Sequence, residues 1–105
     1  MVRGEVFRFR PLRGTRGAEQ RGERFAVVVQ TDELLALSTV LISPTSTSAP
    51  ARSFRPVIEV KGSQTRVLVE QTKAVTPDRL GASLGRLNSS ELNELDTALA
   101  LVFGL

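Results

Sequence analysis

The stretch Phe25-Ala26-Val27-Val28-Val29-Gln30 begins with five consecutive apolar residues. A continuous apolar run of this length is typical of a central β-strand that is covered on both faces. Residues 39–43 form a similar run, and shorter segments at residues 5–9, 56–60 and 66–70 alternate apolar and polar side chains as half-buried strands do. These short, closely spaced strands predict a small, strongly bent antiparallel sheet or a partly open barrel.

The connections between these segments are rich in turn-forming residues. Residues 43–50 read SPTSTSAP, and we expect a loop there because the segment is dense in hydroxyl groups and bounded by prolines. Lys61-Gly62-Ser63 predicts a turn between two strands. Residues 32–37 are expected to form a short helix or a loop.

A helix is expected near the end of the chain. Asn88 followed by Glu91 has the spacing of a capping box. An apolar stripe then recurs on one helical face, which would pack on the sheet or on a partner, and it consists of Leu92, Leu95, Leu99 and Val102. The predicted fold class is therefore mainly β with a C-terminal helix, in a single domain over residues 1–105.

Composition excludes several kinds of chemistry. The 105 residues include no cysteine and no histidine. Disulfides and thiolate metal sites are therefore excluded, and catalysis would depend on Arg, Lys, Ser, Thr, Asp or Glu. No apolar run approaches the roughly 20 residues that span a bilayer. We therefore expect a cytoplasmic protein that acts without a membrane; we also expect no cofactor.

Positive charge is concentrated in the first quarter of the chain. Seven arginines against Glu5, Glu19 and Glu23 give residues 1–24 a net charge of +4, and several of them surround a glycine-rich segment. The planar guanidinium fits a phosphate, and glycine lets a backbone approach one closely. This segment predicts a surface for a polyanion. Nucleic acid is the natural partner, although an acidic protein segment or plain solvation would also suit such a charge.

Several motifs follow one another in a characteristic order, and a leucine-rich helix comes after them: Arg3-Gly4-Glu5-Val6, Arg16-Gly17-Ala18-Glu19-Gln20, residues 23–32, Glu70-Gln71 and Leu84-Gly85-Arg86-Leu87. From about Arg3 to Leu105 the sequence resembles the MazF/PemK family of toxin endoribonucleases. The resemblance implies a small SH3-like barrel related to the CcdB fold. It also implies a homodimeric toxin of a type II toxin-antitoxin pair.

The same resemblance implies an activity and a partner. Such a toxin, of the mRNA interferase type, cleaves single-stranded RNA at short sequence motifs without a metal, and so inhibits translation and growth. Its cognate antitoxin has an acidic C-terminal segment that lies in the RNA groove and blocks it. The apolar residues Leu99, Val102, Phe103 and Leu105 are expected to contribute to the dimer.

Catalytic residues can be assigned by the same resemblance. It puts the catalytic arginine at Arg24, although Phe25 stands where the family usually has proline. The catalytic hydroxyl falls at Ser46, where the family has threonine, with Thr45 and Thr47 as alternatives. Serine keeps the hydroxyl donor and acceptor. Lys73 replaces a family arginine and keeps its charge without the bidentate fork.

The chemistry expected of these residues uses the nucleophile that RNA itself carries. Attack of the 2′-hydroxyl on the adjacent phosphorus expels the 5′-oxygen and leaves a 2′,3′-cyclic phosphate. A fixed guanidinium stabilises the charge that grows on the nonbridging oxygens, which is the role expected of Arg24. Glu19 is expected to accept the proton, or alternatively to pair with a loop arginine and orient it. Further RNA contacts are expected from Arg13, Arg16, Gln20, Arg21, Glu70 and Gln71.

Two other functions stay open at this point. The departures at Phe25 and Ser46 are compatible with a barrel that binds RNA or an antitoxin but cleaves little. A CcdB-like protein would instead poison gyrase by contacting protein. Phe7, Phe9 and Phe25 could stack on bases, but with only five aromatic residues in the chain we expect most of them to be in the core.

Overall fold

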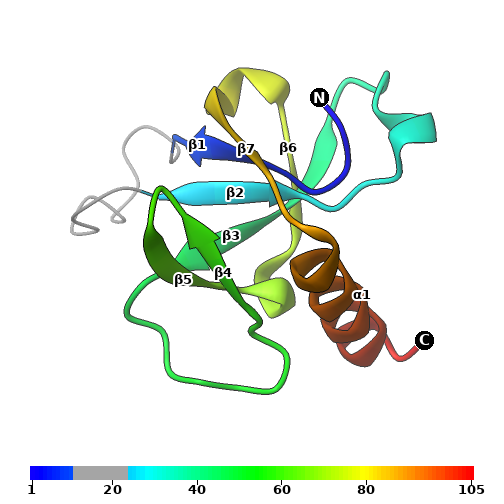
Figure 1. Cartoon of the computed structure of the whole chain (residues 1–105). Coiled ribbons are helices and arrows are strands. Elements are labelled where there is room, and N and C mark those ends of the chain that lie inside the picture. Colours follow the sequence, from blue (N-terminus) through cyan, green and yellow to red (C-terminus); the bar gives the residue numbers. More distant parts are fainter. Residues whose placement is uncertain (11–23) are drawn as a thin grey trace.

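The computed structural model describes residues 1–10 and 24–105, which form a seven-stranded antiparallel sheet and a C-terminal helix (Figure 1). The strands are β1 (Glu5–Phe9), β2 (Phe25–Val28), β3 (Val40–Ser46), β4 (Val57–Val60), β5 (Ser63–Val67), β6 (Lys73–Val75) and β7 (Leu80–Arg86). The helix is α1 (Ser89–Phe103), and short 3₁₀ helices form at η2 (Asp32–Leu34), η3 (Val69–Gln71) and η4 (Pro77–Arg79). The mainly β fold with a C-terminal helix is as predicted.

β2 lies inside the sheet, as its continuous apolar sequence predicts. The strand order is β4-β5-β3-β2-β1-β7, and β6 pairs with the first half of β3. All four residues of β2 are buried. The strand is shorter than the predicted run, but Val29 and Gln30 beyond it are also buried, and the Gln30 side chain bonds Leu34 O and Leu41 N.

Each face of the sheet has its own apolar core, because successive side chains of a strand point to opposite faces. Val6 and Val27 belong to the core that the β4–β5 hairpin and Leu95 of α1 cover. Phe7 and Val28 belong to the core on the other face, with β3, β6 and β7. Burial of each large apolar side chain contributes about 1.5–3 kcal/mol. The sheet is therefore held from both sides.

The β4–β5 hairpin turns where the sequence predicts. Lys61 and Gly62 connect the strands with φ of 54° and 80°, as a two-residue type I′ turn requires. The prediction of a strand over residues 66–70 is wrong, however. β5 begins at Ser63 and ends at Val67, and Gln71 N then bonds Leu68 O within a 3₁₀ turn that leads the chain back to β3.

The expectation of a loop over residues 43–50 is wrong for its first half, because β3 continues through Pro44 to Ser46, and is confirmed for residues 47–50, which belong to no strand. The carbonyl of Pro44 accepts a hydrogen bond from Leu68 N, on the side where β6 has ended and β5 begins. The proline nitrogen faces this same junction, so its missing N–H removes no ladder bond. The strand can therefore carry the hydroxyl-rich segment to the end of the sheet.

The predicted helix forms with its cap. Asn88 Oδ1 accepts from Glu91 N at 2.8 Å, and Glu91 Oε1 accepts from Asn88 N at 3.0 Å. Gly104 ends the helix in the left-handed conformation, with φ of 73°. Of the helices in residues 1–10 and 24–105, none has both the length and the apolar character that crossing a bilayer would need.

Candidate functional site

Arg24 lies directly before β2, at the end of the sheet where β1 and β3 also terminate (Figure 1). It is half-buried, and its Nη1 donates a 3.3 Å hydrogen bond to Thr45 O. Its own carbonyl accepts from Phe9 N at 2.9 Å. These two contacts attach Arg24 to both neighbouring strands, so its guanidinium is held beside the hydroxyl-rich end of β3.

The three candidate hydroxyls differ in their exposure. Thr45 is only 1% exposed, so its side chain cannot meet a ligand in the present arrangement. Ser46 is half-buried and Thr47 is exposed. Ser46 Oγ accepts a 3.2 Å hydrogen bond from Ser48 N and lies 3.3 Å from Ser48 Oγ. The structure therefore favours Ser46 and Thr47 over Thr45.

Ser46 is also the hydroxyl that stands beside Arg24. Ala26 is opposite Pro44 in the β2–β3 register. Continuing this register by two residues brings Arg24 opposite Ser46, and directly opposed residues of antiparallel strands share one face of the sheet. Arg24 and Ser46 can therefore contact the same small group.

A cluster of cations lies around Phe9 at the same end of the sheet, and we call Phe9, Arg24, Lys73 and Arg79 the Phe9 cluster. Lys73 Nζ is 5.3 Å and Arg79 Cζ is 4.7 Å from the centroid of the Phe9 ring. Arg79 Nε donates to Arg10 O at 3.0 Å. No carboxylate within residues 1–10 and 24–105 forms an ion pair with any of the three cations.

The cations of the Phe9 cluster are close enough to affect one another. Burial lowers the pKa of Lys73 below its usual range, and the positive charges of Arg79 and Arg24 lower it further. Positive groups that repel one another without a counter-charge can be stabilised by a bound anion. Sequence reasoning missed Arg79, because it belongs to no recognised motif and only the tertiary fold brings it to Phe9.

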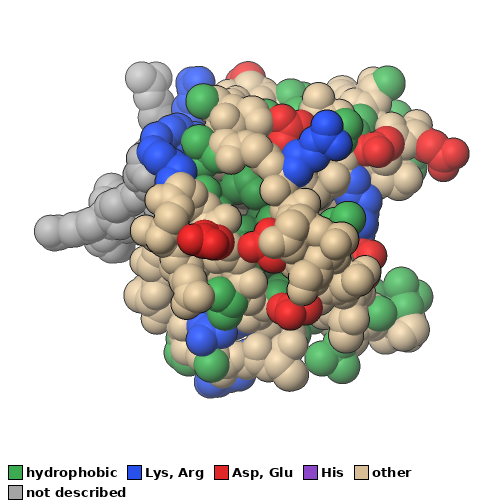
Figure 2. All heavy atoms as spheres, in the orientation of Figure 1, with side chains coloured by type: hydrophobic (Ala, Val, Ile, Leu, Met, Phe, Trp, Pro, Cys, Tyr) green, Lys and Arg blue, Asp and Glu red, His purple; other side chains and the backbone are tan. Residues whose placement is uncertain are grey.

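Charged side chains are spread over the face of the molecule that Figure 2 shows. Lys and Arg side chains gather at its upper left, and further basic and acidic side chains lie at its centre and right. Of the predicted aromatic residues, Phe7 and Phe25 are in the core and only Phe9 meets the cations.

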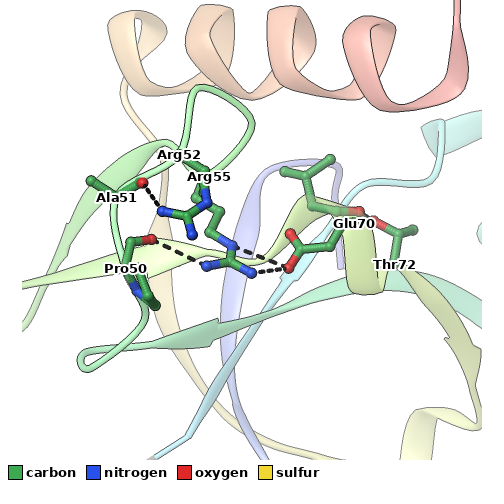
Figure 3. A network of polar contacts seen from close by, with 7 residues as sticks. Pro50, Ala51, Arg52, Arg55, Glu70 and Thr72 are labelled. Carbon is green, nitrogen blue, oxygen red and sulfur yellow. Dashed lines mark hydrogen bonds and ion pairs between the residues drawn. The ribbon is translucent and has the colours of Figure 1, made fainter.

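Glu70 and Gln71 differ in their environment. Glu70 Oε2 accepts from Arg55 Nη2 at 2.7 Å and from Arg55 Nε at 3.1 Å, and Arg55 Nη1 donates to Pro50 O at 3.1 Å (Figure 3). Burial would raise the pKa of Glu70, but the hydrogen bonds from Arg55 and the backbone outweigh it and the pKa is lowered. Glu70 thus ties the loop after β3 to η3, and both Glu70 and Gln71 are exposed.

Arg3, which belongs to the first of the recognised motifs, makes contacts that connect segments of the fold. Its Nη2 lies 2.6 Å from Asp96 Oδ1 of α1, and its Nε donates to Val29 O at 3.0 Å. Its backbone N–H donates to Asp32 Oδ1 at 2.6 Å. Arg3 therefore connects the N-terminus to the helix and to the segment after β2, and its charge is neutralised.

Five of the predicted site residues lie outside the described residues: Arg13, Arg16, Glu19, Gln20 and Arg21. The structure therefore brings together Arg24, Ser46, Thr47 and Lys73 at one end of the sheet, and adds Phe9 and Arg79 to them.

Comparison with known proteins gives the class first. The fold matches an endoribonuclease of a mycobacterial species in complex with its cognate antitoxin, with a TM-score of 0.82 and 20% identity over 100% of this chain and 96% of that one. It also matches MazF from Deinococcus radiodurans, with a TM-score of 0.78 and 18% identity over 100% and 97% of the two chains. At these identities the likeness establishes the MazF fold.

Sequence comparison gives the family. The model of the PemK-like, MazF-like toxins of type II toxin-antitoxin systems matches residues 2–103, and the chain belongs to this family. A Mycobacterium tuberculosis protein described as a candidate toxin is 37% identical over 106 residues, which are 100% of this chain and 99% of that protein. Endoribonuclease MazF9 of the same species is 31% identical over 112 residues, or 96% and 94% of the two chains.

Proposed function

We propose that this toxin is an endoribonuclease that cleaves single-stranded RNA at the end of the sheet where Arg24, Ser46 and the Phe9 cluster meet. The cleavage leaves a 2′,3′-cyclic phosphate and a 5′-hydroxyl, needs no metal, and inhibits translation and growth. The observation that carries the proposal is the set of three cations, Arg24, Lys73 and Arg79, that have no acidic partner among the described residues, together with Ser46, which is opposite Arg24 when the β2–β3 register is continued.

Arg24 stabilises the transition state in this proposal. The 2′-oxygen attacks the adjacent phosphorus, the bond to the 5′-oxygen breaks, and negative charge grows on the nonbridging oxygens. A guanidinium that is already held by Thr45 O needs little rearrangement to meet this charge. Ser46 Oγ donates to the same phosphate and fixes the in-line geometry of the attack. Thr47 is the alternative donor, since it is exposed beside Ser46.

Proton transfer is assigned to one acidic and one basic side chain. Glu19 accepts the 2′-hydroxyl proton, as a carboxylate next to RNA phosphate would have a raised pKa. Lys73 is a suitable donor to the departing 5′-oxygen, because its lowered pKa brings an ammonium group closer to the range useful for acid catalysis.

An acidic antitoxin segment would bind the same cations. Carboxylates placed over the Phe9 cluster make charge-assisted hydrogen bonds with Arg24 and Arg79 and exclude RNA phosphates from them. A structural relative that was solved with its cognate antitoxin supports this proposal. Because both ligands neutralise the same charges, RNA and the antitoxin segment should compete.

A homodimer is proposed through the face beside the end of α1. Phe103 is 58% and Leu105 93% exposed, and a cavity of about 400 Å³ lies between this end of the helix and Leu41 of β3. Leu99 and Val102, also expected at the dimer, pack mainly against the core of this chain. Replacing Phe103 with Asp should give a monomer by light scattering, whereas a dimer of unchanged affinity would exclude this face.

The test of the proposed function is digestion of a long single-stranded RNA by the purified chain in EDTA, with mapping of both new ends. Cyclic phosphate and 5′-hydroxyl ends at a recurring short sequence are expected. Intact RNA that shifts on a gel would indicate a binding protein. Intact and unshifted RNA together with gyrase poisoning would indicate a CcdB-like protein, and either result would overturn the proposal.

A further inference from the structure

Arg24 is not the only guanidinium next to Ser46. Ser46 pairs with Arg66 of β5, and Arg66 pairs in turn with Val57 of β4. Together with the continued β2–β3 register, this gives a row Arg24–Ser46–Arg66 across three neighbouring strands, on one face of the sheet. Strands are spaced about 4.8 Å apart, so the Cα atoms of the two arginines are about 10 Å apart. Ser46 lies between them.

Arg66 has no charged partner among the described residues. Its Nη1 donates a long hydrogen bond of 3.5 Å to Arg55 O, and no carboxylate of residues 1–10 and 24–105 is in ion-pair distance. The nearby Glu70 is already bound by Arg55. Most donors of the Arg66 guanidinium are therefore left for a ligand, although the side chain is half-buried and so restricted in its position.

A small pocket opens beside Arg66. Its volume is about 160 Å³, and it is lined by Thr47, Val57, Gln64, Thr65 and Arg66. Polar side chains dominate this wall, and they include an amide that can both donate and accept. The wall also includes Thr65, which is 3% exposed.

We propose that Arg66 and this pocket form a subsite for one nucleotide of single-stranded RNA, next to the nucleotide held at Arg24 and Ser46. Arg66 binds the phosphate that neighbours the cleaved one, and the pocket receives the attached base, with Gln64 and Thr47 at its edge. The inference rests on the proposed function, because it takes the scissile phosphate to lie between Arg24 and Ser46. It adds a contact on the β5 side, away from the Phe9 cluster.

The subsite can be tested with RNA oligonucleotides that carry 2′-O-methyl groups at every ribose and so cannot be cleaved. Affinity is measured by anisotropy as the chain is lengthened by one nucleotide at either end of the core sequence. One of the two extensions should raise affinity about tenfold for the natural protein. Arg66→Gln should abolish that gain and reduce the slope of log affinity against log salt by about 0.7, as loss of one phosphate contact does.

The matched control is Arg52→Gln, because Arg52 is exposed, its guanidinium donates to the backbone carbonyl of its neighbour Ala51, and it carries the same charge. Arg52→Gln should keep both the gain in affinity from the added nucleotide and the slope of log affinity against log salt. Thermal unfolding checks that Arg66→Gln is folded. If it is not, Arg66→Lys, which keeps the charge without the fork, should keep the slope and lose part of the gain.

Each result tests the subsite, the proposed nuclease or both. Equal gains in the natural protein and Arg66→Gln, or no gain at either end, would overturn the subsite even if the natural protein cleaves RNA. A gain that depends on Arg66 without cleavage of the unmodified core would leave the subsite standing and overturn the nuclease. Absence of all RNA binding would overturn both.

Discussion

Five arginines of the described residues occupy two kinds of environment. Arg3 and Arg55 each bind a carboxylate at 2.6–2.7 Å and also donate to a backbone carbonyl, so their charges are neutralised within the chain. Within residues 1–10 and 24–105, the side chains of Arg24, Arg79 and Arg66 donate to backbone carbonyls, and no carboxylate of these residues pairs with them. The first group connects distant segments, whereas the second lies around the ends of the strands.

This contrast separates stability from function. A neutralised arginine has little to offer a ligand, since its donors are occupied, and its removal should mainly affect folding. An arginine without a carboxylate contributes little to folding, and its charge can be used for an anion. The contrast can be tested by substituting residues of both groups. Each substitution should change either the rate of RNA cleavage or the free energy of unfolding, but not both.

The largest effect is expected at Arg24. Arg24→Ala should reduce the rate of RNA cleavage by about 100- to 1000-fold, because it removes the donor to the transition-state charge. The melting temperature should change little, since the side chain loses one 3.3 Å hydrogen bond. Cleavage is measured under single-turnover conditions beside Arg52→Ala, which removes an exposed arginine. Retention of the natural rate in Arg24→Ala would remove Arg24 from the site.

Ser46→Ala should follow, with a loss of about 10- to 100-fold in cleavage, the size of one hydrogen bond to a charged group. Thr47→Ala is the matched comparison, because it deletes an exposed hydroxyl one residue away. Single-turnover rates are compared for both. If Thr47→Ala loses more activity than Ser46→Ala, the catalytic hydroxyl is Thr47.

Arg55 represents the arginines that bind a carboxylate, and it can be tested through its partner. Glu70→Gln should lower the free energy of unfolding by about 1–2 kcal/mol, because Arg55 loses its charged partner. Folding lowers the pKa of Glu70, so its contribution is present above the unfolded-state pKa and is lost as pH falls through the folded-state pKa. Urea unfolding at neutral and acidic pH should show the two proteins converging in acid. A constant difference would contradict the ion pair as the cause.

Lys73 should give a smaller, pH-dependent effect on binding. Its pKa in the free protein is lowered, and a bound phosphate favours the charged form, so affinity for an uncleavable oligonucleotide should fall as pH rises above the free pKa. The fall should be less than about tenfold and should begin below the usual range of lysine. Lys73→Arg should remove it, because arginine stays charged. Identical profiles for both proteins would exclude Lys73 from the contact.

The smallest effect is expected at Asp96. Asp96→Asn should lower the free energy of unfolding by less than about 1 kcal/mol, since its side chain is 51% exposed and solvent screens the pair with Arg3. RNA cleavage should be unchanged, because the pair lies at α1 and not at the strand ends. A loss of cleavage with unchanged stability would mean that the neutralised arginines also serve the site.

The sequence by itself determined the centre of the sheet and the capped helix. The apolar run at residues 25–30 can be satisfied only by burial, and the Asn88–Glu91 box and the Lys61-Gly62 turn act over a few residues. Its motifs were also enough to place Arg24, Ser46 and Lys73 among the candidates. These signals are local, so they can be recognised without knowing which strand or helix packs against each segment.

The tertiary structure decided what depends on pairing between distant strands. Pro44 joins β3 because its missing N–H falls at the junction between β6 and β5, and β7 forms although its sequence lacks an apolar alternation. Arg79 lies against the Phe9 ring because of the tertiary fold, and Arg66 lies opposite Ser46 because of the β3–β5 register. Which arginines are neutralised likewise depends on where carboxylates distant in sequence arrive, and no local pattern specifies that.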